Sequence, residues 1–243
     1  MTPRLLDPLL KNELAKRVYV AAGLRKPYVR QEKTGHHRIP LLEENGGWLR
    51  LRDYDGPPIP SEEWTSLEYV TYPSDPTTFF APLTSATGET VLRGFWEDGK
   101  PDLDGIWTAN AEKAPTLRRY VESVQARFGR VQLIRQDPNS MREARWGLHL
   151  DDNNRLNPVT NGWVVRAWLE LTDDPRSSLI VRQNQLGRQT EHHISLPRHR
   201  QAVVDSEYLF HGGHHAGPQT RYGLITSFES GPALEAWIRS QLP

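Results

Sequence analysis

The sequence predicts a mainly β protein, an antiparallel barrel or jelly roll, and three observations support this class. From residue 130 onward, short runs rich in β-branched and aromatic residues alternate with turn-forming pieces, about eight runs without a helix between them. The 243 residues include 8 Trp, 19 Pro and 18 Gly, a composition typical of large aromatic fillers and frequent turns. A chain of this length can also enclose a sizeable core.

The first part of the chain indicates one helix followed by irregular segments. Residues 4–22 carry apolar side chains at roughly helical spacing, and Gly23 provides a stop signal. Prolines in residues 53–63 and 72–83 argue against long regular elements there. Residues 88–105 predict a short strand or hairpin edge that is closed by turn residues.

Residues 113–129 predict an amphipathic helix that leads into the β-rich part. Pro115 suits the first turn of a helix, and Gly129 follows its expected end. The segments predicted as strands are RVQLIRQ, RWGLHL, GWVVRAWLEL, SSLIVRQN, EHHISL, RQAVVDS, EYLFHGG and RYGLITSF. Residues 231–242 predict a short closing helix.

This organisation favours a single domain over residues 1–243. Its expected parts are an N-terminal helical and irregular region (1–112), a helix with a β-barrel core (113–230) and a C-terminal helix (231–243).

Composition excludes several classes of function. The 30 basic and 30 acidic residues balance, so no net field attracts nucleic acid or an anionic membrane. The absence of cysteine excludes disulfides, thiolate metal sites and a cysteine nucleophile. No apolar run approaches the roughly 18 residues that cross a bilayer, and no apolar signal segment begins the sequence. We therefore expect a soluble, cytoplasmic protein.

A histidine and an aspartate two residues apart provide the first chemical signal. His149 and Asp151 end the run RWGLHLD, and alternate side chains of a strand share one face. An imidazole and a carboxylate on one face can hold a divalent ion, and a further imidazole would complete a two-histidine, one-carboxylate site. Alone, the pair is a weak signal, because a polar strand end can carry the same residues by chance.

A later stretch supplies candidates for the missing groups. His211 closes the run YLFH, and Arg221 opens the next strand-like run ten residues later. In a hairpin of that length the guanidinium can return to the same cavity, where its planar fork suits bidentate pairing with a carboxylate. His214 and His215 compete with His211 for the distal position, although His214 lies only seven residues before Arg221.

Together these residues resemble the 2-oxoglutarate/Fe(II)-dependent dioxygenases. The shared pattern is H-x-D (His149, Asp151), a distal histidine (His211) and an arginine ten positions beyond it (Arg221). The surrounding segments RVQLIRQDPNSMREARWGLHLD, VVRAWLEL and RQAVVDSEYLFHGG look like the aspartyl/asparaginyl β-hydroxylase and free-proline hydroxylase branch. The resemblance covers roughly residues 113–230 and implies a double-stranded β-helix (jelly-roll, cupin-like) core.

The resemblance also implies a role for each residue. His149, Asp151 and His211 would bind Fe(II), with 2-oxoglutarate and O2 as co-substrates. Arg221 would pair with the distal carboxylate of 2-oxoglutarate, and Arg166, in the strand after H-x-D, would make a second contact. The segment between Asp151 and Arg166 is longer than the family pattern, which indicates a substrate-covering loop. Asp151 favours hydroxylation, because related halogenases lack this carboxylate.

Other polar residues near the motif are weaker candidates. The candidate substrate contacts are Arg145, Asn153, Asn154 and Arg155, although DDNNRLN is equally consistent with an ordinary polar turn. His192 and His193 occupy adjacent positions, so at most one faces inward, and a role at a strand edge is the simpler interpretation. His36, His37 and His199 have no partner pattern.

The sequence therefore predicts a non-haem Fe(II)- and 2-oxoglutarate-dependent hydroxylase. Its expected substrate is a small molecule, a free amino acid or a derivative, with an unactivated C–H bond. Two other classes remain open, a cupin-type metalloenzyme (isomerase or dioxygenase) that needs no 2-oxoglutarate and a non-catalytic binding barrel. The first would not need Arg221, and the intact H-x-D motif and distal histidine argue against the second.

Overall fold

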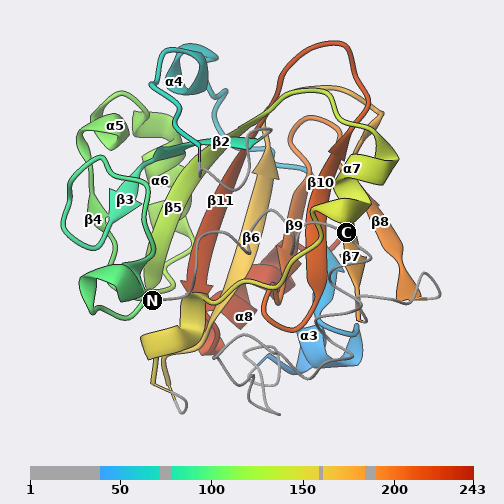
Figure 1. Ribbon diagram of the computed structural model, residues 1–243. Coiled ribbons are helices and arrows are strands. Elements are labelled where there is room, and N and C mark those ends of the chain that lie inside the picture. Colours follow the sequence, from blue (N-terminus) through green and yellow to red (C-terminus); the bar gives the residue numbers. More distant parts are fainter. Residues whose placement is uncertain (1–38, 72–77, 159–160, 184–189) are drawn as a thin grey trace, which may run out of the picture.

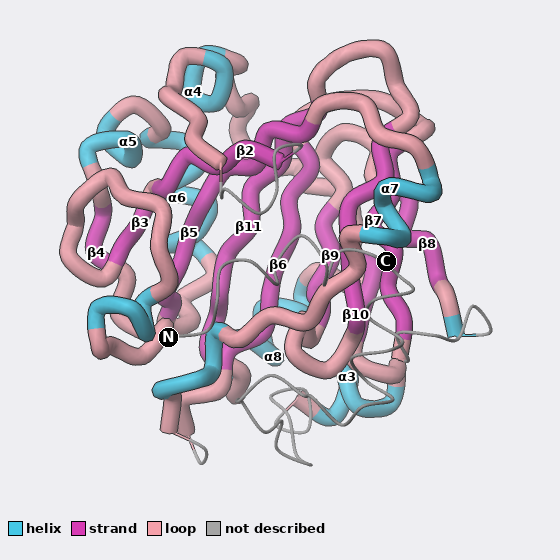
Figure 2. The backbone as a smooth tube through the Cα atoms, viewed as in Figure 1, coloured by secondary structure: helices cyan, strands magenta, loops and turns pink. Residues whose placement is uncertain are grey.

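Two antiparallel β-sheets form the main body of the molecule (Figure 1). The computed structural model describes residues 39–71, 78–158, 161–183 and 190–243. The helix predicted over residues 4–22 lies outside these ranges. The mainly β, antiparallel class expected from the sequence is confirmed, and the strands of both sheets can be followed in the backbone trace (Figure 2).

The larger sheet brings together strands that are far apart in the sequence. In spatial order it contains β1 (Trp48–Arg50), β9 (Gln201–Val204), β6 (Val164–Glu170), β11 (Arg221–Glu229), β5 (Phe128–Gln136) and β2 (Thr78–Pro82). Its edges β1 and β2 come from the region that the sequence predicted to be helical and irregular. Pro82 is compatible with β2 because it is an edge strand, where one side of the backbone needs no ladder partner.

The smaller sheet contains β10 (Phe210–His215), β7 (Ser177–Arg182) and β8 (His192–Ser195), in that order. Beside β10, an isolated bridge joins His149 to His211. The strand predicted over RWGLHL is therefore wrong for its first residues. Helix α7 (Met141–Trp146) takes them instead, because Ser140 and Glu143 form a capping box at its start.

The helices correct two further boundaries. Helix α6 (Pro115–Ser123) begins at the proline as predicted but ends before residue 129. Gln125 adopts a positive φ of 58°, which stops the helix, and β5 begins three residues later. Residues 88–105 contain the 3-10 helix η3 (Phe95–Asp98) and no strand. The closing helix is confirmed as α8 (Pro232–Ser240).

The remaining elements are short and lie outside the two main sheets. They are α3 (Pro40–Glu44), α4 (Glu62–Thr65), α5 (Ala109–Glu112), η4 (Asn153–Leu156) and the pair β3 (Thr84–Ser85) and β4 (Ile106–Trp107). Within the described ranges, no helix combines the length and the apolar character that are needed to cross a membrane.

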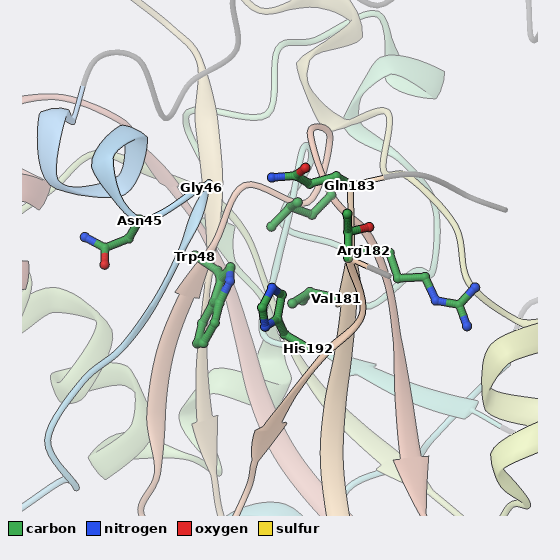
Figure 3. A pocket seen from close by; sticks show the side chains of 9 residues that line it. Asn45, Gly46, Trp48, Val181, Arg182, Gln183 and His192 are labelled. Atoms are coloured by element: carbon green, nitrogen blue, oxygen red, sulfur yellow. The ribbon is translucent and has the colours of Figure 1, made fainter. Parts of the chain in front are cut away.

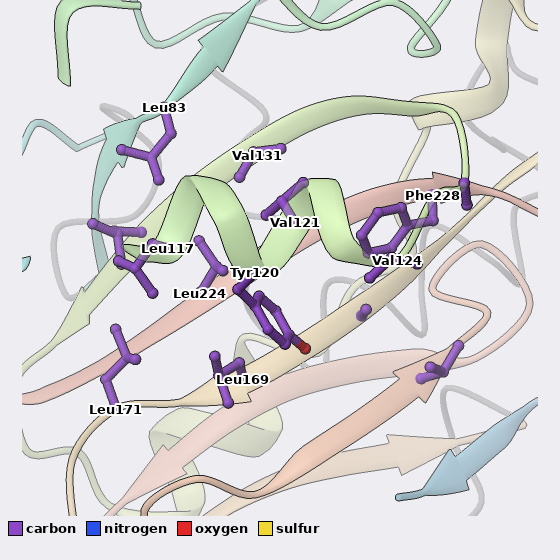
Figure 4. Close-up of a cluster of buried hydrophobic side chains, with 14 of the residues drawn as sticks. Leu83, Leu117, Tyr120, Val121, Val124, Val131, Leu169, Leu171, Leu224 and Phe228 are labelled. Carbon is purple, nitrogen blue, oxygen red and sulfur yellow. The ribbon is translucent and has the colours of Figure 1, made fainter. Parts of the chain in front are cut away.

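Apolar side chains fill three layers. Between the sheets, Trp168 of β6 packs in one cluster with Leu179 and Val181 of β7. On the outer face of the larger sheet, α6 and α8 cover a second cluster, which includes Leu117, Val121, Leu169, Leu224 and Phe228 (Figure 4). Each fully buried side chain of this size contributes about 1.5–3 kcal/mol. A third, smaller cluster joins α7 to the outer face of β7.

Candidate metal centre

Three side chains that the sequence singled out converge on one point. His149, Asp151 and His211 each offer a ligand atom, and these atoms all lie within 4.8 Å of one another. Oδ1 of Asp151 is 3.7 Å from Nε2 of His149 and 3.8 Å from Nε2 of His211. The two imidazole centroids are 4.5 Å apart. The structure thus brings both halves of the predicted motif together.

Backbone pairing explains the convergence. His149 and His211 exchange two hydrogen bonds, from N of His149 to O of His211 at 3.1 Å and from N of His211 to O of His149 at 2.9 Å. This antiparallel bridge sets the two imidazoles side by side. Asp151 then donates its backbone N–H to O of Ser206 at 3.0 Å, which holds the carboxylate near the same point.

The outer nitrogen of each imidazole is tied to the backbone. Nδ1 of His149 lies 2.9 Å from O of Gly147, and Nδ1 of His211 lies 3.2 Å from O of Leu209. A carbonyl oxygen only accepts hydrogen bonds, so each Nδ1 must carry the proton. In the neutral form of each ring, Nε2 then keeps a lone pair on the side of Asp151, which is the tautomer a metal ligand needs.

The two oxygens of Asp151 have separate surroundings. Oδ2 accepts hydrogen bonds from Nε of Arg166 at 3.1 Å and from Nδ2 of Asn153 at 3.0 Å. Oδ1 faces the two imidazoles instead. The carboxylate is therefore oriented through one oxygen and presents the other to the candidate metal position.

Electrostatics favour the charge states that bind a cation. Burial opposes ionisation of Asp151, but Arg166 and then the two imidazoles outweigh it and hold the pKa of this carboxyl well below its ordinary value. Burial, with a smaller effect of His149, lowers the pKa of His211 to about 4. At neutral pH the group is an ionised carboxylate beside a neutral buried imidazole.

Exposure differs across the three side chains. The side chain of His149 is 56% exposed, whereas those of Asp151 and His211 are 16% and 7% exposed. The cluster is thus open on the His149 side and closed on the other. Two imidazole nitrogens and one carboxylate oxygen on one side of an ion fit Fe(II) and leave coordination positions for further ligands.

Arg166, on β6, contacts Asp151 through the oxygen that does not face the imidazoles. Besides Asp151, its guanidinium donates to Oγ of Ser227 at 2.7 Å and to Oδ1 of Asn153 at 3.0 Å. Ser227 in turn donates to Oδ2 of Asp102 at 3.0 Å. The contact of Arg166 with 2-oxoglutarate stays a prediction, and the contact in the structure is with the candidate metal ligand.

Arg221 is the first residue of β11 and is buried. It lies at the opposite end of this strand from Ser227, which contacts Arg166. Its Nε and Nη2 donate to the carboxylate of Glu170, and Nη1 donates to Oε1 of Gln136 at 2.8 Å. Both Glu170 and Gln136 belong to strands of the larger sheet that flank β11. The pairing of Arg221 with 2-oxoglutarate stays a prediction, and the guanidinium already holds a carboxylate of this chain.

The candidate substrate residues fall into different surroundings. Asn153 touches Asp151, whereas Asn154 is buried and ties η4 to Glu207 and Val164. The guanidinium of Arg155 stacks over the ring of Trp96, 4.2 Å from its centroid. Arg145 pairs with Glu191 on the outer side of the smaller sheet. Their contact with a substrate stays a prediction.

The competing histidines lie apart from the cluster. His214 is one position out of phase with His211 on β10, so it faces the other side of the sheet. His193 contacts Glu191, and His192 stacks on Trp48 with centroids 5.6 Å apart. His192 and Trp48 also line a pocket beside α3 and the end of β7, together with residues that include Asn45, Val181 and Arg182 (Figure 3). His199 packs against Tyr54.

Sequence reasoning did not single out Glu170, Ser227 or Asp102. For Glu170 a signal was present, because VVRAWLE places Arg166, Trp168 and Glu170 at alternate positions on one face of a strand. Asp102 and Ser227 carry no such pattern, since they meet only through the tertiary fold.

Comparison with known proteins shows a likeness at the level of solved structures only. No family model matches the chain, and no curated protein matches it. A 2OG-Fe(II) oxygenase family oxidoreductase from Burkholderia pseudomallei aligns with 13% identity and a TM-score of 0.48, over 85% of this chain and 96% of that chain.

Two further solved structures align over similar shares. HygX from Streptomyces hygroscopicus, with nickel and 2-oxoglutarate bound, aligns with 13% identity and a TM-score of 0.47, over 83% of this chain and 87% of that chain. A Trichoplax adhaerens prolyl hydroxylase, in complex with a hypoxia inducible factor peptide, aligns with 11% identity and a TM-score of 0.48, over 82% and 91%. At these identities and scores the likeness carries no argument about activity.

Proposed function

We propose that the protein is a non-haem Fe(II)- and 2-oxoglutarate-dependent hydroxylase acting on an amino acid or a related small molecule. The overall reaction is R–H + 2-oxoglutarate + O2 → R–OH + succinate + CO2. One observation carries the proposal: His149, Asp151 and His211 place one ligand atom each within 4.8 Å of the others, on an antiparallel β scaffold.

The surrounding residues support this role. Backbone carbonyls fix the two imidazoles in the tautomer that presents Nε2, and Arg166 and Asn153 fix the carboxylate of Asp151. Three ligands on one side leave adjacent positions for the co-substrate and oxygen. When bound, Fe(II) with 2-oxoglutarate and O2 supplies the oxidant for an unactivated C–H bond, and the protein supplies orientation.

Arg221 is the proposed partner of the distal carboxylate of 2-oxoglutarate. Its guanidinium is buried among inward-facing side chains, and its planar fork is suited to a carboxylate. The proposed substrate contacts remain Arg145, Asn153, Asn154 and Arg155. Among these, Asn153 is the one that hydrogen-bonds a proposed metal ligand, through Oδ2 of Asp151.

Anaerobic reconstitution tests the proposal. Adding Fe(II) and 2-oxoglutarate to the purified protein should give a weak metal-to-ligand charge-transfer band in the visible. His149→Ala and Asp151→Ala should lose the band, because each removes a proposed ligand. Asp152→Ala is the matched control: it removes the neighbouring carboxylate, which is outside the cluster, and should keep the band. A wild-type protein without a band would contradict the proposal.

Screening then addresses the substrate. Free amino acids and their derivatives should be compared for stimulation of succinate formation, with the reconstituted wild-type protein and the Asp151→Ala variant in parallel. Stimulation that depends on Asp151 would support an amino-acid substrate. A screen in which no amino acid stimulates succinate formation would remove this part of the proposal while leaving the metal centre intact.

A second candidate is a metalloenzyme of the same fold that needs no 2-oxoglutarate. The observation in its favour is that Arg221 is already paired with Glu170 and Gln136. This candidate predicts that the protein binds Fe(II) or Mn(II) through the same three ligands but that 2-oxoglutarate produces no charge-transfer band. An Arg221→Ala variant that folds and keeps full activity would also favour it.

A further inference from the structure

Arg221, the proposed binding residue for the distal carboxylate of 2-oxoglutarate, already pairs with a carboxylate of the chain itself. Glu170 accepts hydrogen bonds from Nε of Arg221 at 3.1 and 3.0 Å and from Nη2 at 2.9 Å. Both side chains are only 1% exposed. Glu170 ends β6, and Arg221 opens the neighbouring strand β11, so the pair lies across the ladder that joins these two strands.

Neighbouring groups close the remaining sides of the pair. Thr172 donates to Oε1 of Glu170 at 3.0 Å, and Gln136 accepts from Nη1 of Arg221 at 2.8 Å. Gln136 also donates to O of Gly213 at 2.9 Å, across the gap to the smaller sheet. A Cβ at Gly213 would lie 2.5 Å from Oε1 of Gln136 and 3.0 Å from Nη1 of Arg221, so the backbone of β10 packs directly against this group.

Burial raises the pKa of Glu170, whereas the Arg221 guanidinium and the hydrogen bonds from Arg221 and Thr172 oppose this rise. The guanidinium stays protonated and is equally buried, so the ionised form of Glu170 is the one that compensates its charge. An incoming acid therefore meets a neutralised arginine. With Glu170 in place, a second carboxylate on Arg221 would bring two negative charges to one guanidinium in a site from which water is excluded. Like charges at that separation repel strongly in a low-dielectric surrounding. Displacing Glu170 instead would leave a buried carboxylate without its cation, which also costs free energy.

We propose that Glu170 is a specificity-determining residue of the oxo-acid site, because by pairing with Arg221 it limits the preference for 2-oxo acids that carry a second carboxylate. The inference rests on the proposed function, since it concerns the same co-substrate site. It differs in what it predicts: the selectivity among oxo acids depends on Glu170, whereas the metal centre does not.

The test compares two oxo acids of equal chain length. 2-Oxoglutarate carries a distal carboxylate, and 2-oxopentanoate carries a methyl group in its place. Their dissociation constants are measured calorimetrically on the Mn(II)-loaded protein, so no turnover is needed. The wild type should prefer 2-oxoglutarate by no more than about threefold, and Glu170→Gln should raise this preference by about tenfold or more.

Two controls separate this effect from a general one. Glu191→Gln neutralises another buried carboxylate, which pairs with Arg145 and Arg182, and it should leave the preference unchanged. Mn(II) affinity should be the same in Glu170→Gln and in the wild type, because Glu170 is outside the metal cluster.

The outcomes that overturn the inference are distinct from those that overturn the function. If Glu170→Gln binds 2-oxoglutarate more weakly, Glu170 only positions Arg221, and the inference fails while the metal centre stands. If Glu170→Gln does not fold, the wild type decides, since a preference for 2-oxoglutarate well above about tenfold contradicts a neutralised arginine. A wild type that binds no Mn(II) overturns both the proposed function and this inference.

Discussion

At the scale of single residues, Asp151 is positioned through the oxygen that does not face the imidazoles. Arg166 supplies the cation at Oδ2, and its own guanidinium is held by Ser227 and Asn153. Because the side chain of Arg166 is only 4% exposed, it has little freedom to adopt another rotamer. The carboxylate of Asp151, which it contacts, is held in a fixed orientation as a result. The orientation of the proposed ligand therefore depends on a residue that does not itself touch the metal position.

Arg166→Gln tests this dependence. Losing a hydrogen-bond partner behind a metal ligand typically costs about 10–100-fold in metal affinity, and we expect a loss of that size for Mn(II), measured by calorimetric titration. Arg166→Lys keeps the charge and should recover part of the affinity. The control Arg239→Gln, which removes an exposed arginine of α8, should bind Mn(II) like the wild type. Unchanged affinity in Arg166→Gln would show that Asp151 is oriented without it.

At the scale of elements, helix α7 determines where the His149 segment starts. Ser140 accepts a hydrogen bond from N of Glu143 at 3.2 Å, and the Glu143 carboxylate accepts from N of Ser140 at 2.7 Å. This reciprocal pair fixes the first turn, and the hydrogen bond from N of Gly147 to O of Glu143 closes the last turn, so that the helix ends at Trp146, three residues before His149. The packing of α7 against β7 and β10 then places the segment beside its partner strand.

Ser140→Ala should lower the free energy of unfolding by about 1 kcal/mol, because it removes the side-chain acceptor at the helix start. Urea denaturation measures this change. Ser61→Ala is the matched control, since Ser61 precedes helix α4 without a capping hydrogen bond from its side chain. Equal losses in the two variants would show that the capping box contributes nothing specific.

The sequence predicted much of the β-rich half because its signals are local. Alternating apolar residues and turn residues mark β6, β7, β10 and β11, and the H-x-D pattern depends only on neighbours along the chain. The edge strands β1 and β2 escaped prediction, because such short strands form only when a partner strand is present. The Arg221–Glu170 pair escaped it as well, since 51 residues separate its members and only the ladder between β6 and β11 joins them.

At the scale of the whole molecule, the described part of the region before residue 113 is fastened to the β core by buried polar contacts. Glu63 accepts hydrogen bonds from N of Thr116 and N of Leu117 at the start of α6. Asp102 accepts from N of Arg130 and from Ser227. These contacts support the proposal of a single domain, because they would leave buried groups unpaired if the two parts separated.

A buried acid near the proposed site makes stability depend on pH. Glu207 accepts two hydrogen bonds from Asn154, at 3.1 Å each, and burial raises the pKa of this carboxyl to about 8. In the unfolded chain the group ionises near its ordinary pKa of 4.5. Between these two values the folded protein keeps a proton that the unfolded chain has released. Stability therefore falls as pH rises from about 5 to 8, and the slope disappears above the folded pKa.

Glu207→Gln removes the ionisable group while keeping a neutral side chain of similar shape. Between pH 5 and pH 8 the wild type should lose about 3 kcal/mol of stability that the variant keeps. The free energy of unfolding of the variant, minus that of the wild type, should therefore increase by about 3 kcal/mol over this range, as measured by urea denaturation at each pH. At pH 5 the variant should be less stable than the wild type, because its amide group cannot accept both hydrogen bonds from Asn154. The control Glu235→Gln removes a partly exposed carboxylate of α8, and its difference from the wild type should stay within about 1 kcal/mol over the same range. If the free energies of unfolding of Glu207→Gln and the wild type change with pH in parallel, Glu207 is ionised in the folded protein at neutral pH. A second negative charge would then lie near the Asp151 carboxylate and would oppose its ionisation.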